Sequence, residues 1–349
     1  MNKVLFFLVL FFCSNSSWGQ IGGDNVYEFL NFSSSARITG LGGNLITIKD
    51  DDVSLAQANP ALLNPTMHQA ISFNHNFHLA GIQHGFVNYG HEIKPWKINV
   101  HGGIQYTSYG EFIGTNEFGN VTGNFKASEY AITMGASHQL YENLSIGANV
   151  KVISSQLEAY HSVGIATDLA AFYQDSSKSF SATLVVRNLG TQLSTYEEGR
   201  QESLPLDLQF GISKKLKYLP FRFSIIAHNL QRWNILYDDP NQEETTLLFG
   251  DEQNNSERSN ASIFFDNLFR HFIFNGEFLF GKTENFRLRV GYNHFRRKEL
   301  SVENFRSLSG FSLGLGFKIN RFRIDYGRSF YHIAGGVNHF SISTNLQSF

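Results

Sequence analysis

The sequence predicts an all-β fold, a transmembrane antiparallel β-barrel of about fourteen strands with an N-terminal plug in its lumen. Three observations lead to this prediction: an N-terminal export signal, long segments in which apolar and polar residues alternate, and connections that are short at one end and long at the other. Aromatic residues make up 15% of the 349-residue chain, yet its mean hydropathy is only −0.20. Beyond the export signal, no apolar run approaches the roughly 20 residues of a membrane-spanning helix.

The N-terminus has the three parts of a secretory signal peptide. Lys3 supplies a positive charge, residues 4–12 are continuously apolar, and Ser17 and Gly19 offer small side chains at the positions that a signal peptidase reads. The apolar run is too short to cross about 30 Å of hydrocarbon as a helix, and a bulky residue before Cys13 disfavours a lipoprotein. We therefore predict that residues 1–19 are removed. The only cysteine leaves with them, so the mature protein has no disulfide and no thiol chemistry.

Alternation of period two recurs along most of the chain and predicts strands, because a helix would require spacings of three and four. In residues 285–293, for example, four apolar side chains alternate with arginine, glycine and asparagine. A soluble sandwich would face its apolar residues inward, whereas a membrane barrel faces them toward lipid and its polar residues toward the lumen. The segments are about ten residues long, which suits a tilted bilayer crossing. Aromatic residues at their ends, and the final Phe349, also favour the membrane barrel.

The predicted strands number fourteen, and single-chain bacterial barrels have an even number. If both termini of the chain are periplasmic, every second connection should be short. These short connections are residues 91–97, 141–143, 175–177, 214–219, 282–284 and 320. The predicted long external loops are residues 110–127, 190–204, 231–270 and 298–308. Residues 262–271, at the end of the longest loop, predict a short amphipathic helix at the outer rim. The predicted strands are residues 69–77, 82–92, 97–108, 128–140, 144–157, 161–174, 178–189, 205–215, 220–230, 271–281, 285–297, 309–319, 321–330 and 335–346.

Residues 24–67 lack this alternation and contain glycine-rich, acidic and Asn-Pro-Ala motifs. A barrel of this size encloses a lumen that is too wide for wall side chains to fill. We therefore predict three parts: a signal peptide over residues 1–19, a plug over 20–67 and a barrel over 68–349.

Charged residues on the polar faces of the strands are candidates for the lumen. A conducting pore would use them for selectivity, whereas a closed barrel would pair them with one another, because buried charges need partners. Their mixed signs favour pairing. The charges expected to face inward are Lys151, Asp207, Arg287, Arg289 and Asp325.

Catalytic and metal-binding patterns are weak throughout. Residues 50–52 are three aspartates without the ligand spacing of a calcium loop, and we interpret them as a solvated turn. His75, His78, His84 and His91 have irregular spacing, which favours lumenal or interfacial positions over a metal site. We find no nucleophile elbow, phosphate-binding loop or dinucleotide fingerprint. We therefore expect no enzyme, no cofactor and no metal, and a net charge of −2 argues against a nucleic-acid partner.

The plug motifs resemble a known family. Residues 36–43 (ARITGLGG), 50–54 (DDDVS) and 59–63 (NPALL) resemble the N-terminus of the PorV/PorQ group, barrels of the type IX secretion system in Bacteroidetes and distant relatives of the FadL fatty-acid transporters. Residues 264–267 (FFDN) and 289–294 (RVGYNH) are similar to the PorQ branch of that group. The similarity covers nearly the whole mature chain, and the joint pattern is more specific than the Asn-Pro-Ala motif. The plug positions that carry it are Arg37, Gly42, Gly43, Asn59, Pro60 and Ala61.

The resemblance implies a non-enzymatic role in protein secretion at the outer membrane. Such barrels are expected to hold a PorZ-like protein at the cell surface, with PorU- and PorV-like components, where cargo is cleaved and attached to lipopolysaccharide. We expect partner contacts on the external loops, including Phe264, Phe265 and Asn267. Two alternatives remain. A FadL-like transporter of hydrophobic small molecules predicts an apolar pocket between plug and wall with an exit, and a general diffusion porin predicts conductance.

Overall fold

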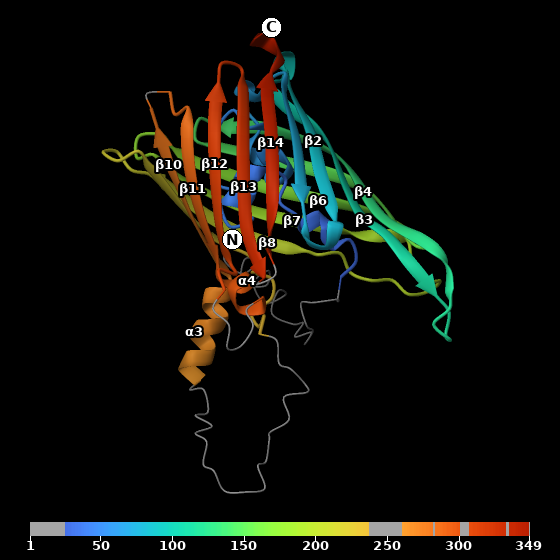
Figure 1. Ribbon diagram of the computed structural model, residues 1–349. Helices are drawn as coiled ribbons and strands as arrows, with labels where there is room; N and C mark the ends of the chain where they lie inside the picture. The colour runs from blue at the N-terminus through green and yellow to red at the C-terminus, as the bar shows by residue number, and fades with distance from the viewer. Residues whose placement is uncertain (1–24, 237–259, 282, 301–306, 333–334, 349) are drawn as a thin grey trace, which may run out of the picture.

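The computed structural model describes residues 25–236, 260–281, 283–300, 307–332 and 335–348, so the predicted signal peptide lies outside the described residues. Within them, fourteen antiparallel strands close into one barrel, as predicted (Figure 1). Each strand pairs with its neighbours in sequence, and β1 pairs with β14 to close the wall. The strands are β1 (Ala70–Phe77), β2 (Gln83–Ile93), β3 (Ile98–Thr115), β4 (Val121–Tyr141), β5 (Leu144–Leu157), β6 (Tyr160–Asp175), β7 (Phe180–Ser194), β8 (Asp207–Lys215), β9 (Phe221–Ala227), β10 (Phe272–Phe280), β11 (Phe286–Asn293), β12 (Phe311–Ile319), β13 (Phe322–His332) and β14 (Gly335–Asn345).

The two faces of the wall have opposite character. On β4, Ile132 and Met134 are 52% and 69% exposed, whereas Thr133 between them is fully buried. The same alternation runs along the neighbouring strands, with apolar residues outside and polar residues inside. This is the inverted arrangement of a barrel whose outer surface contacts lipid. None of the described helices is long and apolar enough to cross a membrane.

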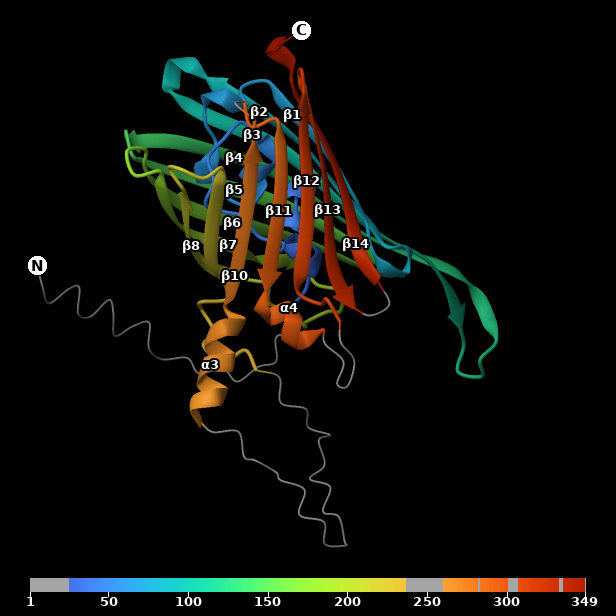
Figure 2. The same cartoon turned by 60° about the vertical axis from the view of Figure 1, so that its left-hand side comes forward.

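The two ends of the barrel also differ. The start of β1 and the end of β14 lie at one end, together with the short turns, and the connections that contain α3 (Asn260–Arg270) and α4 (His294–Glu299) lie at the other (Figures 1 and 2). Because long loops are external in such barrels, the end with α3 and α4 is the external end. The helix predicted over residues 262–271 corresponds to α3. The strand predicted over 285–297 was too long, because Asn293 caps α4 by accepting a hydrogen bond from the Arg296 backbone N–H.

The loop predicted over residues 110–127 was wrong. Instead, β3 and β4 continue as a paired ribbon to Thr115 and Val121, and only residues 116–120 form the turn. The glycines and polar residues of this stretch suggested a loop, but its pairing depends on cross-strand partners such as Phe112 and Phe125, which periodicity along one strand does not reveal.

Residues 25–69, which we call the plug segment, lie inside the barrel and are largely buried. Short helices make up much of this segment, and side chains at Ser35, Asp52, Asn59 and Asn64 cap four of them. Helix α2 (Ala36–Gly40) packs on the inner face of β11 to β14. The remaining described helices are η1 (Glu28–Asn31), η2 (Val53–Gln57), η3 (Pro60–Leu62), η4 (Pro65–Met67), η5 (Leu79–Gly81), η6 (Lys94–Trp96) and η7 (Leu346–Ser348).

Glycine permits the closest approach of plug and wall. A Cβ on Gly40 of α2 would lie 2.8 Å from the Cα of Gly314 on β12, which is nearer than side-chain carbons come to backbone. Two further glycines follow α2, Gly42 with φ of 82° and Gly43 with φ of 90°, values that favour glycine. The Gly42 N–H donates to the Ser312 hydroxyl over 2.7 Å. The ARITGLGG motif is thus the segment by which the plug lies directly against the wall.

Candidate functional site

A network of buried ion pairs joins the plug segment to one side of the wall. Arg37 of α2 is completely buried, and its guanidinium lies 2.8 Å from Asp50, 3.3 Å from Asp52 and 3.3 Å from Glu277 on β10. Glu277 also pairs with Arg289 on β11, over 2.9 Å. Plug and wall therefore share one network in which every charge has an opposite charge beside it, as burial requires.

The interpretation of residues 50–52 as a solvated turn was wrong. Asp52 is only 4% exposed, and it both caps η2 and pairs with Arg37. Asp51 pairs with Arg323 of β13, over 2.5 Å. The sequence does not reveal these roles, because both arginines are distant along the chain and reach the aspartates only when the barrel closes around the plug.

The predicted lumenal charges occupy three separate places. Arg289, Asp325 and Arg287 belong to the Arg37 network: Arg289 lies 2.5 Å from Asp325, and Arg287 lies 3.8 Å from Asp50. Lys151 is far from them and pairs with Asp168 over 2.8 Å. Asp207 lies near the external end, where it accepts a hydrogen bond from the Asn229 N–H over 2.7 Å.

The Asn-Pro-Ala motif has a structural role in the plug segment. Asn59 is fully buried; its side-chain oxygen accepts from the Ala61 N–H over 2.9 Å, and its amide donates to the Ile46 carbonyl over 2.7 Å. Pro60 occupies the first turn of η3, where its missing N–H leaves no bond unmade. Ser145 of β5 donates to the Ala61 carbonyl over 2.8 Å. The motif therefore builds a capped turn and ties it to the wall.

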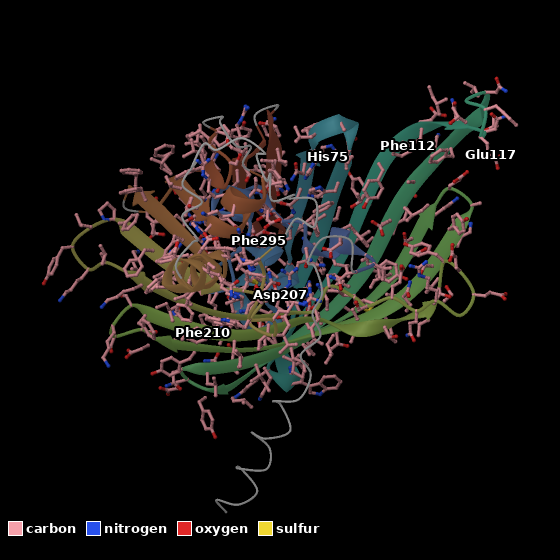
Figure 3. The ribbon with its side chains drawn as sticks, turned by 90° about the horizontal axis from the view of Figure 1, so that it is seen from below. His75, Phe112, Glu117, Asp207, Phe210 and Phe295 are labelled. Atoms are coloured by element: carbon pink, nitrogen blue, oxygen red, sulfur yellow. The ribbon has the colours of Figure 1, made fainter. Side chains whose placement is uncertain are left out.

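A polar cavity of about 490 Å³ opens at the external end, between the start of the plug segment and the wall. Its lining includes Arg187, Asp207, His228 and Arg296. Figure 3, which views the barrel from the external end, shows Asp207 and Phe295 within the barrel mouth. Charged and amide groups cost free energy when an apolar ligand covers them. This cavity therefore differs from the apolar pocket that the transporter alternative predicts.

The cavity lies where β7 and β8 separate. Their ladder ends at the pair of Arg187 and Asp207, although β7 continues to Ser194. On the external side of this pair, the start of the plug segment approaches the wall, and Asn25 forms a parallel bridge with Ser203. The wall is thus completed here by the plug segment and by the residues before β8, rather than by a continuous ladder.

Helix α3 at the outer rim is amphipathic, with its polar face toward the barrel and its apolar face toward the outside. A helix packed on the core of a soluble protein has the opposite arrangement. The polar residues of α3 face the barrel: Asn267 is 4% exposed, donating to the Trp233 carbonyl over 2.6 Å and accepting from the Ile235 N–H. Its aromatic residues face away, since Phe264 and Phe265 are 49% and 55% exposed. Of the three predicted partner-facing residues, the two phenylalanines are therefore open, whereas Asn267 holds the helix in place.

Ion pairs bind α3 to α4. Asp266 lies 2.9 Å from Lys298 and 3.2 Å from Arg270, and Arg270 also lies 2.6 Å from Glu299. Burial raises the pKa of Asp266, but the adjacent Lys298 and Arg270 outweigh it, so the net effect lowers the pKa below its ordinary value. Burial lowers the pKa of His294. The described residues contain no cluster of three or more acidic, histidine or cysteine side chains that could hold a metal ion.

Comparison with known proteins identifies the barrel type. No family model and no curated protein matches this sequence. Among solved structures, the monoaromatic hydrocarbon channel CymD is similar, with a TM-score of 0.52 and 14% identity over 90% of this chain and 98% of that one. The toluene transporter TodX of Pseudomonas putida (TM-score 0.50, 12% identity) covers 89% of this chain and 96% of its own. A FadL homologue of Pseudomonas aeruginosa (0.50, 9%) covers 89% and 98%.

At these identities the likeness shows the fold. The chain folds as a closed barrel of fourteen strands that is similar to FadL-type barrels, and its location is the outer membrane. Of these structural neighbours, CymD is a monoaromatic hydrocarbon channel and TodX is a toluene transporter; neither is an enzyme.

Proposed function

We propose that this barrel is a non-enzymatic component of the type IX secretion system that holds a PorZ-like protein at the cell surface through its outer rim. The observation that carries the proposal is the outward aromatic face of α3. Phe264, Phe265 and Phe269 are each about half exposed, at 49%, 55% and 46%. Exposed aromatic groups that lie together favour a protein interface, because aromatic side chains dominate binding energy in interfaces.

The direction of α3 favours a protein over the lipid surface as its partner. An interfacial helix lies in the membrane plane with its apolar face in the headgroup region. Helix α3 instead extends away from the barrel mouth, roughly along the barrel axis, in both views (Figures 1 and 2). Most of its length therefore lies beyond the rim, and its aromatic face points into the space outside the membrane.

The buried network supports a platform rather than an open pore. Arg37 of the plug segment pairs with Glu277 of wall strand β10. Elsewhere in the lumen, Asp168 neutralises Lys151. Removing one partner of a buried pair costs about 3–5 kcal/mol, so these contacts resist displacement of the plug segment.

The test replaces the aromatic face of α3. In cells, Phe264→Ser with Phe265→Ser should reduce co-purification of the PorZ-like protein from outer membranes in mild detergent by about tenfold or more. The matched control is Tyr218→Ser, which changes an 89% exposed aromatic residue in the turn at the opposite end. Undiminished co-purification with the α3 variant, or complete processing and surface attachment of cargo in a deletion strain, would sink the proposal.

A FadL-like transporter of hydrophobic small molecules is the second candidate. The comparisons support this candidate more than the first, since the similar structures are a hydrocarbon channel, a toluene transporter and a FadL homologue. The early end of the β7–β8 ladder also favours it, because a transporter needs an exit through the wall. The 490 Å³ cavity beside this place is polar and does not add to that support. Uptake of radiolabelled toluene and of a long-chain fatty acid should fall in a deletion strain if the candidate is correct. Unchanged uptake of both would exclude it.

A further inference from the structure

The ribbon formed by β3 and β4 beyond the barrel wall, residues 110–127, is called the arm here. The β2–β3 ladder ends at Ser108, and the β4–β5 ladder begins at Ala127. Between these points the two strands of the arm pair with each other, from Gly110 with Ala127 to Thr115 with Val121. The arm projects past the rim on the side of the barrel away from α3 (Figures 1 and 2), and Figure 3 shows Phe112 and Glu117 out on it.

A bulge and a fixed base set the arm's direction. The register shifts between Ser108 and Gly110, and Gly110 has φ of 88°, which favours glycine. Tyr109 lies between these two residues, and its hydroxyl donates a hydrogen bond to the Glu129 carboxylate over 2.5 Å. The arm therefore leaves the wall at a defined point instead of continuing the barrel.

The outer edge of β3 in the arm carries unused backbone groups. On the β4 side, the Lys126 carbonyl accepts from the Glu158 N–H over 3.3 Å, so that edge is partly occupied. On the β3 side, no described strand other than β4 pairs with residues 111–115, because the β2–β3 ladder ends at Ser108. The Asn116 N–H donates across the ribbon to Asn120. Because backbone groups alternate sides along a strand, those of Glu111, Ile113 and Thr115 face outward.

This edge has only part of the protection usual in natural sheets: Glu111 is the one charge within residues 111–115, and register shifts lie between Ser108 and Gly110 and between Gly114 and Thr115. Long free edges are normally interrupted by proline or inward charges, yet residues 110–127 contain no proline and only three charged side chains, Glu111, Glu117 and Lys126. Apolar groups are open instead: Ile113 is 69% exposed and Phe118 is 85% exposed. A two-stranded ribbon alone is marginally stable in water, and a third strand adds both hydrogen bonds and a packed face.

We propose that the outer edge of β3 in the arm accepts an extended segment of a surface protein as a third strand. Backbone hydrogen bonds from Glu111, Ile113 and Thr115 would hold the segment, since strand addition draws its affinity from the main chain. Alternate apolar side chains of the segment would pack against Phe112 and Phe125, whose rings stack at 5.2 Å. Lipid tails have no groups to pair with the free N–H row, so the chemistry of this edge selects a polypeptide.

The inference uses a surface separate from α3 and goes beyond the proposed function. It is tested by hydrogen exchange rather than by co-purification, so the two fail independently. If α3 does not bind the PorZ-like protein, protection of the arm still stands. If the arm is unprotected, the α3 interface is unaffected.

The experiment measures amide hydrogen exchange of residues 110–116 by mass spectrometry, in native outer-membrane vesicles and in the purified protein in detergent. We expect exchange about tenfold slower or more in native membranes, because added ladder bonds protect the amides. Ile113→Pro removes one outward donor without touching the β3–β4 ladder and should restore fast exchange at the remaining outward amides. Ile113→Ala keeps the donor and should retain protection.

Three results would overturn the inference. The first is equal exchange in membranes and detergent. The second is protection that grows with concentration of the purified protein, which would indicate a second copy of this chain. The third is protection lost with Ile113→Ala but kept with Ile113→Pro, which would indicate side-chain contact alone. Thr115→Pro, at the next outward position toward the tip, checks the result should Ile113→Pro prevent insertion of the barrel.

Discussion

The barrel wall and helix α3 share one pattern, with polar groups toward the barrel axis and apolar groups away from it. In the wall, Ile132 and Met134 face outward while Thr133 faces the lumen. In α3, Phe264 faces outward while Asn267 faces the barrel. The difference is what covers the apolar side. The bilayer covers the wall, but α3 extends beyond the rim. There Trp233 and His294 contact Phe264 and Phe269 only in part, and the aromatic face stays about half exposed. The same sequence pattern therefore indicates a lipid contact in one region and a partner contact in the other.

The largest loss of stability is expected when the buried ion-pair network between plug segment and wall loses Arg37. Arg37→Ala leaves Asp50, Asp52 and Glu277 without their shared cation, and we expect a loss of about 3–5 kcal/mol in the free energy of unfolding. The control is Arg200→Ala, which removes an exposed pair with Glu197 at 3.9 Å and should cost less than about 1 kcal/mol. Urea titration of the purified barrel in detergent, followed by its heat-modifiable migration on gels, measures both. Equal midpoints would show that the plug network contributes no stability.

Packing between plug and wall is tested at Gly40. Alanine has a higher helix propensity than glycine, so local propensity predicts that Gly40→Ala stabilises α2. The structure predicts the opposite, because the new Cβ would lie 2.8 Å from the Gly314 backbone. We expect a cost of about 1–3 kcal/mol and faster proteolysis within residues 25–69. Gly102→Ala, where a Cβ would meet nothing within 4 Å, is the control. A more stable Gly40→Ala variant would contradict the close contact.

The pH dependence of the contact between α3 and α4 tests how α3 is held at the outer rim. The pKa of Asp266 is lowered in the folded protein, so its carboxylate stabilises the contact above its ordinary pKa of 3.8. That contribution is lost as the pH falls below about 4 and through the folded pKa. Fluorescence of Trp233, measured in a Trp96→Phe background, should stay constant from pH 7 to pH 5 and change below about pH 4. Asp266→Asn should remove this acid transition. A transition at the same pH in both proteins would assign it to another group.

Much of the wall could be predicted because its signal is local. Every predicted strand has a counterpart in the structure, and the short and long connections fall at opposite ends. In residues 144–157, for example, side chains two positions apart share one face, and this period indicates a strand. The period persists along the whole strand because one face contacts lipid and the other contacts polar groups. The helix at the rim was visible for the same reason, since its periodicity lies within eleven residues.

The sequence by itself therefore determined the membrane barrel, its strand number and the presence of an irregular segment before it. Only the tertiary structure decided that Asp52 is buried against Arg37, that residues 110–127 form a ribbon, and that the polar face of α3 is the one toward the barrel. These features depend on groups that are distant in the chain or on which side of an amphipathic element finds a cover. Periodicity shows that an element has two faces, but the surroundings in three dimensions determine what each face contacts.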